Sequence, residues 1–153
     1  MASVATEEIR YGTGDVEMRG HLALDTSVSG PRPVVFVVHE WWGRNEYATG
    51  RADQLAALGY AGFAIDLYGD ARVAANPDEA GAAMTGLVED MSVTRSRFLA
   101  ALEAVSGHTA VDGSRAGAIG FCFGGGVVVL GIILGLILPH LRFRRRRDSW
   151  GSL

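Results

Sequence analysis

The sequence predicts an α/β domain built on a largely parallel sheet. Short apolar runs alternate along the chain with segments of helical character, which is the pattern of a sheet flanked by helices. Residues 34–38 are all valine and phenylalanine, with no polar face, as in a central strand that helices cover on both sides. With 153 residues, of which 48% are hydrophobic, the chain is long enough to bury one core.

Turn and cap residues predict the other elements in order. Further strands are expected at residues 7–11, 16–24, 61–67 and 115–121, with turns at 12–15 and 111–114. Asn45 is placed to cap a helix over 46–58. Asn76, followed by proline and two acidic residues, starts a second helix that reaches residue 105 with a break near Gly86.

Residues 120–125 read Gly-Phe-Cys-Phe-Gly-Gly and contain the chain's one cysteine. A nucleophile with glycines two positions away on either side, between a strand and a helix, is the signature of a nucleophile elbow. The neighbours must be small because the strand and the helix approach closely at such a turn. The turn also aims the next backbone N–H, that of Phe123, at a developing oxyanion. Cys122 is therefore the candidate nucleophile.

Charge divides the chain into an acidic body and a basic tail. Residues 1–139 carry nine arginines and sixteen acidic residues, whereas 140–153 carry five arginines and one aspartate. The acidic body does not suit a nucleic-acid partner. A single cysteine excludes an internal disulfide and says little about the compartment. The polar residues 1–11 do not read as a secretory signal, and a cytoplasmic location is expected.

A second interpretation concerns residues 117–138, which carry no charge and precede an arginine-rich stretch. That pattern fits a membrane span near 117–138 with a basic flank, and hence a membrane-associated, non-catalytic protein anchored through 117–147. Five glycines between 117 and 126 favour strand, elbow and helix start instead. The remaining run, 127–138, is too short to span a bilayer.

Four segments together resemble the dienelactone hydrolase family of α/β-hydrolases. They are Pro-Val-Val-Phe-Val-Val-His-Glu-Trp-Trp-Gly-Arg-Asn at 33–45, Leu-Gly-Tyr at 58–60, Asp-Leu-Tyr-Gly at 66–69, and Ile-Gly-Phe-Cys-Phe-Gly-Gly at 119–125. They occur in the family's order and cover about residues 10–126. The resemblance implies an α/β-hydrolase fold and a carboxymethylenebutenolidase-like activity, in which small lactones or esters are opened through a thioester without metal or cofactor.

The resemblance also implies roles for four residues. Cys122 would be the nucleophile, and Glu40 would lie beside the thiol and help to remove its proton. The backbone N–H groups of Trp41 and Phe123 would form the oxyanion hole. For the arginines that hold the substrate's carboxylate in the family, this chain offers only Arg72, in a different setting.

Other polar and aromatic residues near these motifs have simpler interpretations. His39 is expected to pack or hydrogen-bond at a strand end, and Asp66 to be a structural loop carboxylate. Trp41 and Trp42 either line a substrate pocket or cover the sheet edge.

The C-terminal part departs from the family. Its triad aspartate and histidine lie well downstream of the elbow, and the 153 residues end before either. Residues 1–126 are therefore expected to be the N-terminal part of a hydrolase domain, truncated and inactive. Residues 127–153 are an atypical apolar run and arginine-rich tail, arising from a frameshift or forming a real anchor.

Overall fold

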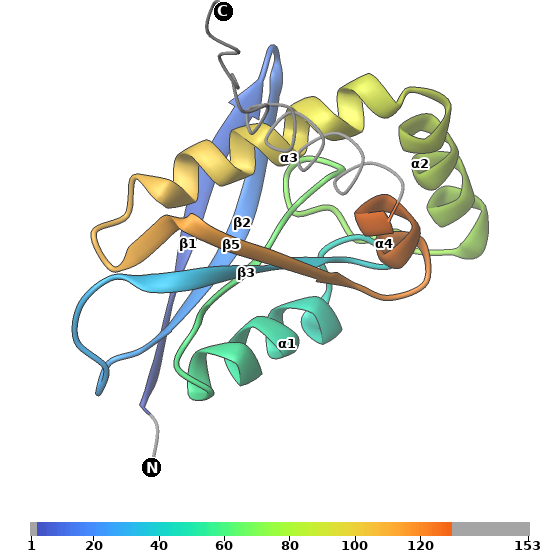
Figure 1. Cartoon of the computed structure of the whole chain (residues 1–153). Helices are drawn as coiled ribbons and strands as arrows, with labels where there is room; N and C mark the ends of the chain where they lie inside the picture. The colour runs from blue at the N-terminus through green and yellow to red at the C-terminus, as the bar shows by residue number, and fades with distance from the viewer. Residues whose placement is uncertain (1–2, 130–153) are drawn as a thin grey trace, which may run out of the picture.

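One sheet of five strands organises the described part of the chain, residues 3–129 of a computed structural model (Figure 1). The strand order is β1-β2-β4-β3-β5. The strands are β1 (Val4–Thr13), β2 (Val16–Asp25), β3 (Arg32–Val38), β4 (Ala61–Ala64) and β5 (Val111–Gly120). β1 and β4 both pair antiparallel with β2, and β3 pairs parallel with β4 and β5. Only β2 thus runs against the other described strands, and the predicted mostly parallel sheet is confirmed.

Four helices flank the sheet in the described residues: α1 (Glu46–Ala57), α2 (Pro77–Glu89), α3 (Met91–Ser106) and α4 (Phe123–Gly126). α1 covers one face, and α3 covers the other, with α2 and α4 on the same side as α3 (Figure 1). This arrangement explains why the central strands lack a polar face.

The two faces are packed with different side chains. Phe36 lies between Phe98 of α3 and Phe63 of β4, with ring centroids 4.9 and 5.8 Å away. Burying each such ring stabilises the fold by roughly 1.5–3 kcal/mol. On the other face α1 presents small buried residues, Ala48, Ala52 and Ala56. Small side chains let α1 approach the sheet closely.

The predicted helix caps are confirmed. The Asn45 side chain accepts a hydrogen bond from the N–H of Ala48 at 3.2 Å, and that of Asn76 accepts from Glu79 at 3.0 Å. Gly59 follows α1 with a φ of 92°, a left-handed conformation that glycine adopts without strain. These three positions show that the helix ends are specified locally.

The helical segment that starts at Asn76 is broken, as predicted, but four residues later than Gly86. Gly86 lies inside α2, and the break comes at Asp90. The carboxylate of Asp90 caps α3 by accepting from the N–H groups of Ser92 and Val93. Cap chemistry therefore decides the break, and the low helix propensity of a glycine does not.

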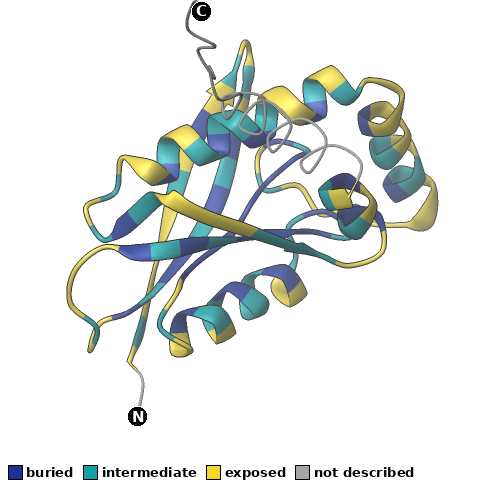
Figure 2. Cartoon of the chain, in the orientation of Figure 1, coloured by how far each residue is buried: buried dark blue, intermediate teal, exposed yellow. Residues whose placement is uncertain are grey.

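The last strand begins before the predicted residue 115, because the predicted turn is a bulge inside β5. Asp112 accepts from the N–H of Ser114 at 3.1 Å and from its hydroxyl at 2.6 Å. The register with β3 shifts there, from Pro33 opposite Asp112 to Val34 opposite Ala116. β5 ends the sheet order, and residues 114–117 are exposed along it (Figure 2).

The membrane-span interpretation does not describe the part of 117–138 that the structure covers. Residues 117–120 belong to β5 and 123–126 to α4. Within residues 3–129, no helix has the length and apolar character needed to cross a bilayer. The rest of the proposed span, residues 130–138, lies outside the described residues. So does most of the predicted tail at 127–153.

Candidate active site

Cys122 occupies a strained turn between β5 and α4. Its φ of 53° and ψ of −120° lie in a region that residues with a side chain rarely adopt, and the residue is exposed. The glycines on either side are required by space. A Cβ at Gly120 would lie 2.3 Å from the carbonyl carbon of Gly124, and one at Gly124 would lie 2.3 Å from the Val38 carbonyl oxygen. The turn thus has the geometry of a nucleophile elbow.

Cys122 and Glu40 follow neighbouring strand ends. Val38 and Gly120 are register partners at the carboxyl ends of β3 and β5, and Glu40 and Cys122 each come two residues later. Glu40 is half-buried. Open α/β sheets bind ligands at this edge. A hydrogen bond between the thiol and the carboxylate stays a prediction.

The two backbone N–H groups predicted for the oxyanion hole come from the same edge. Trp41 lies in the loop after β3, and Phe123 is the first residue of α4, with its side chain buried in the core. Within residues 3–129 neither N–H donates a hydrogen bond to a protein group. Among the described residues, these two N–H groups thus have no hydrogen-bond partner.

The loop that carries Trp41 is held from the opposite side by the segment after β4. The Tyr68 hydroxyl donates to the Trp41 carbonyl, and the Ala74 N–H donates to the Trp42 carbonyl, each at 2.9 Å. Gly43 has a φ of 97°, and a Cβ there would lie 2.1 Å from the carbonyl oxygen of Arg72. Trp41 and Trp42 are half-buried and stack edge to face at 5.1 Å.

His39 has both ring nitrogens engaged and is only 1% exposed. Nδ1 lies 2.6 Å from the Glu40 carbonyl oxygen, and Nε2 lies 3.2 Å from the Leu67 backbone nitrogen. A carbonyl only accepts and a backbone N–H only donates, so the partners assign the neutral ring with its proton on Nδ1. Burial lowers the pKa of His39, which favours that neutral form. The prediction that His39 hydrogen-bonds at a strand end is confirmed.

Asp66 is a structural carboxylate, as predicted. It is fully buried, and its oxygens accept hydrogen bonds from four backbone N–H groups, those of Arg19, Tyr68, Gly69 and Ala71. The backbone carbonyl of Asp66 accepts a hydrogen bond from the Tyr11 hydroxyl, and the Asp66 N–H donates one to the oxygen of that hydroxyl, both at 2.8 Å. Burial raises the pKa of Tyr11, so the phenol stays neutral. No acceptor site of the Asp66 carboxylate is left to orient a catalytic histidine.

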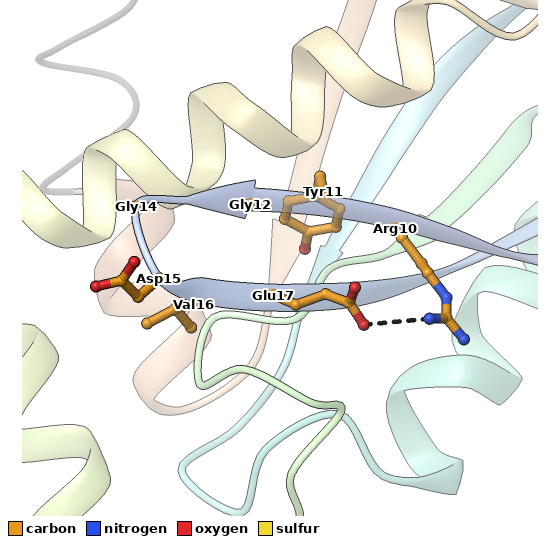
Figure 3. A pocket seen from close by; sticks show the side chains of 7 residues that line it. All are labelled: Arg10, Tyr11, Gly12, Gly14, Asp15, Val16 and Glu17. Atoms are coloured by element: carbon orange, nitrogen blue, oxygen red, sulfur yellow. Dashed lines mark hydrogen bonds and ion pairs between the residues drawn. The ribbon is translucent and has the colours of Figure 1, made fainter.

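Two cavities lie away from the elbow. One, of about 340 Å³, lies at the β1–β2 turn and is lined by Arg10, Tyr11, Gly12, Gly14, Asp15, Val16 and Glu17 (Figure 3). The other, of about 270 Å³, is lined by Tyr68, Arg72 and Arg97 together with small and aliphatic residues of α2 and α3. Arg72 also lies 3.8 Å from Glu79, so part of its charge is already balanced. Neither cavity includes Cys122 or Glu40.

Metal-binding side chains do not gather in the described part of the chain. Among residues 3–129, no group of three or more His, Cys, Asp or Glu side chains is arranged to hold a metal ion.

Sequence reasoning missed Tyr68, which holds the loop after β3, and gave no partners for the hydrogen bonds of His39. Tyr68 and His39 both lie in motifs that were noted, but their hydrogen bonds join segments 27 and 28 positions apart in the chain. Only the pairing of β3 with β4 brings these segments together.

The sheet order, the flanking helices and a strained elbow at the carboxyl end of β5 define an α/β-hydrolase fold. Comparison with protein families gives the family. The model described as "Dienelactone hydrolase family" matches residues 18–136. This chain belongs to the dienelactone hydrolase family. The matched residues continue past 126, and the domain boundary predicted there stays a prediction.

Individual relatives agree with this assignment. The chain is 38% identical to a dienelactone hydrolase-like promiscuous phosphotriesterase from metagenomic libraries, with a TM-score of 0.79 over 84% of this chain and 53% of that one. For the solved structure named m3DLH the identity is 39% and the TM-score 0.78, over 82% of this chain and 52% of that one. Protein usf of Aquifex pyrophilus is 31% identical over 121 residues, 76% of this chain and 51% of its own length. The chain spans about half the length of these relatives.

Proposed function

We propose that this chain carries the acyl-transfer site of a cysteine-dependent hydrolase for small esters and lactones. The observation that supports this most directly is the elbow, where an exposed thiol sits on a strained turn. Family membership supports the hydrolase class, and the thiol in place of a serine hydroxyl supports a thioester intermediate.

The proposed reaction assigns each group one task. Glu40 accepts the proton of the Cys122 thiol, and the sulfur attacks the substrate's carbonyl carbon. The carbonyl oxygen becomes an oxyanion, which the N–H groups of Trp41 and Phe123 stabilise. The tetrahedral intermediate collapses to a thioester, and the leaving oxygen takes the proton held by Glu40.

Deacylation needs a base that activates water, and the described histidines are engaged elsewhere. His21 lies 2.8 Å from Asp53, and His108 lies 3.2 Å from Glu7. His39 uses both nitrogens, as described above. We therefore propose that these 153 residues alone are acylated once and do not turn over.

A burst experiment with p-nitrophenyl acetate tests the proposal. The expected result is release of up to one equivalent of p-nitrophenol, an acetyl group on Cys122 by mass spectrometry, and no steady phase above background. Cys122→Ala, the matched control, should show neither burst nor acetylation. Absence of acetylation in the wild type would sink the thiol mechanism, and steady turnover lost in Cys122→Ala would sink the single-turnover proposal.

The alternative function, a membrane-anchored non-catalytic protein, gains no specific observation from residues 3–129. The first part of its proposed span is β5, the elbow and α4.

A further inference from the structure

The peptide unit between Glu40 and Trp41 links the core to the proposed oxyanion hole. The carbonyl of Glu40 and the N–H of Trp41 belong to this one planar group. No peptide bond in the described residues is cis, so the two groups point in opposite directions. Whatever holds the Glu40 carbonyl therefore sets the direction of the Trp41 N–H.

Two donors hold that carbonyl. The Nδ1–H of His39 reaches it at 2.6 Å, and the N–H of Gly43 closes a turn onto it at 3.2 Å. The shorter bond comes from the buried side. The carbonyl is thus directed at the core, and the Trp41 N–H is directed away from it.

The His39 ring is itself fixed in place. Its Nε2 accepts from the Leu67 N–H, and its centroid lies 4.8 Å from the Tyr68 ring and 6.5 Å from the Phe123 ring. Phe123 supplies the second proposed oxyanion donor. The imidazole thus bonds the Glu40 carbonyl of the first half of the proposed hole and lies near the side chain of Phe123, which supplies the second.

We propose that His39 is a positioning residue of the oxyanion hole. Through its Nδ1–H it orients the Glu40–Trp41 peptide so that the Trp41 N–H is presented at the sheet edge where Cys122 lies. His39 does not touch the reacting atoms. The effect of His39 on the rate of Cys122 acylation rests on the proposed function. Its effect on the orientation of the Glu40–Trp41 peptide does not.

Two variants separate this role from general packing. In His39→Asn, the amide nitrogen stands where Nδ1 stands, so the bond to Glu40 is kept and the bond from Leu67 is lost. In His39→Gln, the amide oxygen reaches the Nε2 position, so the bond from Leu67 is kept and the bond to Glu40 is lost. Each variant removes the ring and one hydrogen bond, and only the retained bond differs.

The expected acylation rates differ accordingly. Acetylation of Cys122 by p-nitrophenyl acetate should fall less than about tenfold in His39→Asn and about 10²-fold in His39→Gln, the cost of losing one oxyanion-hole donor. In ¹⁵N-labelled protein, the Trp41 amide resonance should stay near its wild-type position in His39→Asn and move in His39→Gln. Equal rate losses in two folded variants, or a Trp41 amide unmoved in His39→Gln, would overturn the proposal.

Measurements on the wild type keep the two proposals distinguishable. If the wild type is not acetylated, the proposed function fails, and the Trp41 amide comparison alone decides the positioning role. If a variant does not fold, the tautomer of the His39 imidazole in the wild type, measured by NMR, tests the positioning role instead. A neutral Nδ1–H tautomer with a scalar coupling to the Glu40 carbonyl supports the proposal, and an Nε2–H tautomer refutes it.

Discussion

Val38 and Gly120 are register partners at the carboxyl ends of β3 and β5. Glu40 and Cys122 each lie two residues further along, so one strand pairing brings a carboxylate and a thiol to the same edge of the sheet. The fit is tight, because the backbone of Gly124 lies against the carbonyls of Val38 and His39. The elbow is thus built against the end of β3, and the following predictions use that relationship.

The first prediction concerns the charge of Glu40. Glu40→Gln keeps the size of the side chain and removes the proton acceptor. A general base contributes about 10²- to 10⁴-fold, so acetylation of Cys122 by p-nitrophenyl acetate should fall by at least ~10²-fold. Glu46→Gln, at an exposed carboxylate in the first turn of α1, is the control and should stay near the wild-type rate. A Glu40→Gln variant as fast as wild type would remove Glu40 from the mechanism.

The second prediction concerns the glycines of the elbow helix. A Cβ at Gly124 would lie 2.3 Å from the carbonyl oxygen of Val38 and 2.6 Å from that of His39, whereas one at Gly126 meets no atom of residues 3–129 within 4 Å. Gly124→Ala should therefore lower the free energy of unfolding by about 1–3 kcal/mol or more, since backbone must shift. Gly126→Ala should be neutral or stabilising by up to about 1 kcal/mol. Urea denaturation measures both, and equal stabilities would contradict the packing described here.

The third prediction concerns backbone strain at the nucleophile. Cys122 has a φ of 53° and a ψ of −120°, a conformation that costs a non-glycine residue of order 1–3 kcal/mol. Cys122→Gly should thus be more stable than Cys122→Ala, which retains the strain and also lacks the thiol. Thermal unfolding of the two thiol-free variants isolates the backbone contribution. If the glycine variant were the less stable one, the elbow would not be strained.

The fourth prediction is a pH dependence of stability from His39. Burial lowers its pKa in the folded chain below the ordinary value of 6.5. Well above pH 6.5 the ring is neutral in both states and contributes no dependence on pH. Below it the unfolded chain binds a proton that the folded chain does not, so the free energy of unfolding falls by up to about 1.4 kcal/mol per pH unit.

Urea titrations between pH 7.5 and 5 measure this slope, and His39→Asn should flatten it. The pairs of His21 with Asp53 and His108 with Glu7 are present in both proteins and cancel in the comparison. The carboxylates with lowered pKa, Asp25, Asp90 and Asp112, lose their contribution only below about pH 3.8, outside the range used. Equal slopes in wild type and variant would show that His39 titrates normally.

Features specified by neighbours along the chain were predictable from the sequence. The glycine spacing around Cys122 predicts the elbow, because the clash it avoids involves Gly120 and Gly124, four positions apart. Asn45 and Asn76 predict helix starts, because a cap bonds an N–H three residues on. The helix breaks at Asp90 and not at Gly86, because the low helix propensity of glycine is a weak effect beside the cap that Asp90 supplies.

Features that join distant segments were decided by the tertiary structure. The register of β3 with β5, which pairs Val38 with Gly120 just before Glu40 and Cys122, includes a bulge at Asp112 that no local pattern placed inside the strand. The sequence alone determined that a cysteine elbow and an acidic residue each follow a strand. Only packing of the sheet against its helices decided that those strands are neighbours. The same packing buries His39 at the end of β3, where its ring bonds the Glu40 carbonyl and the Leu67 N–H at once.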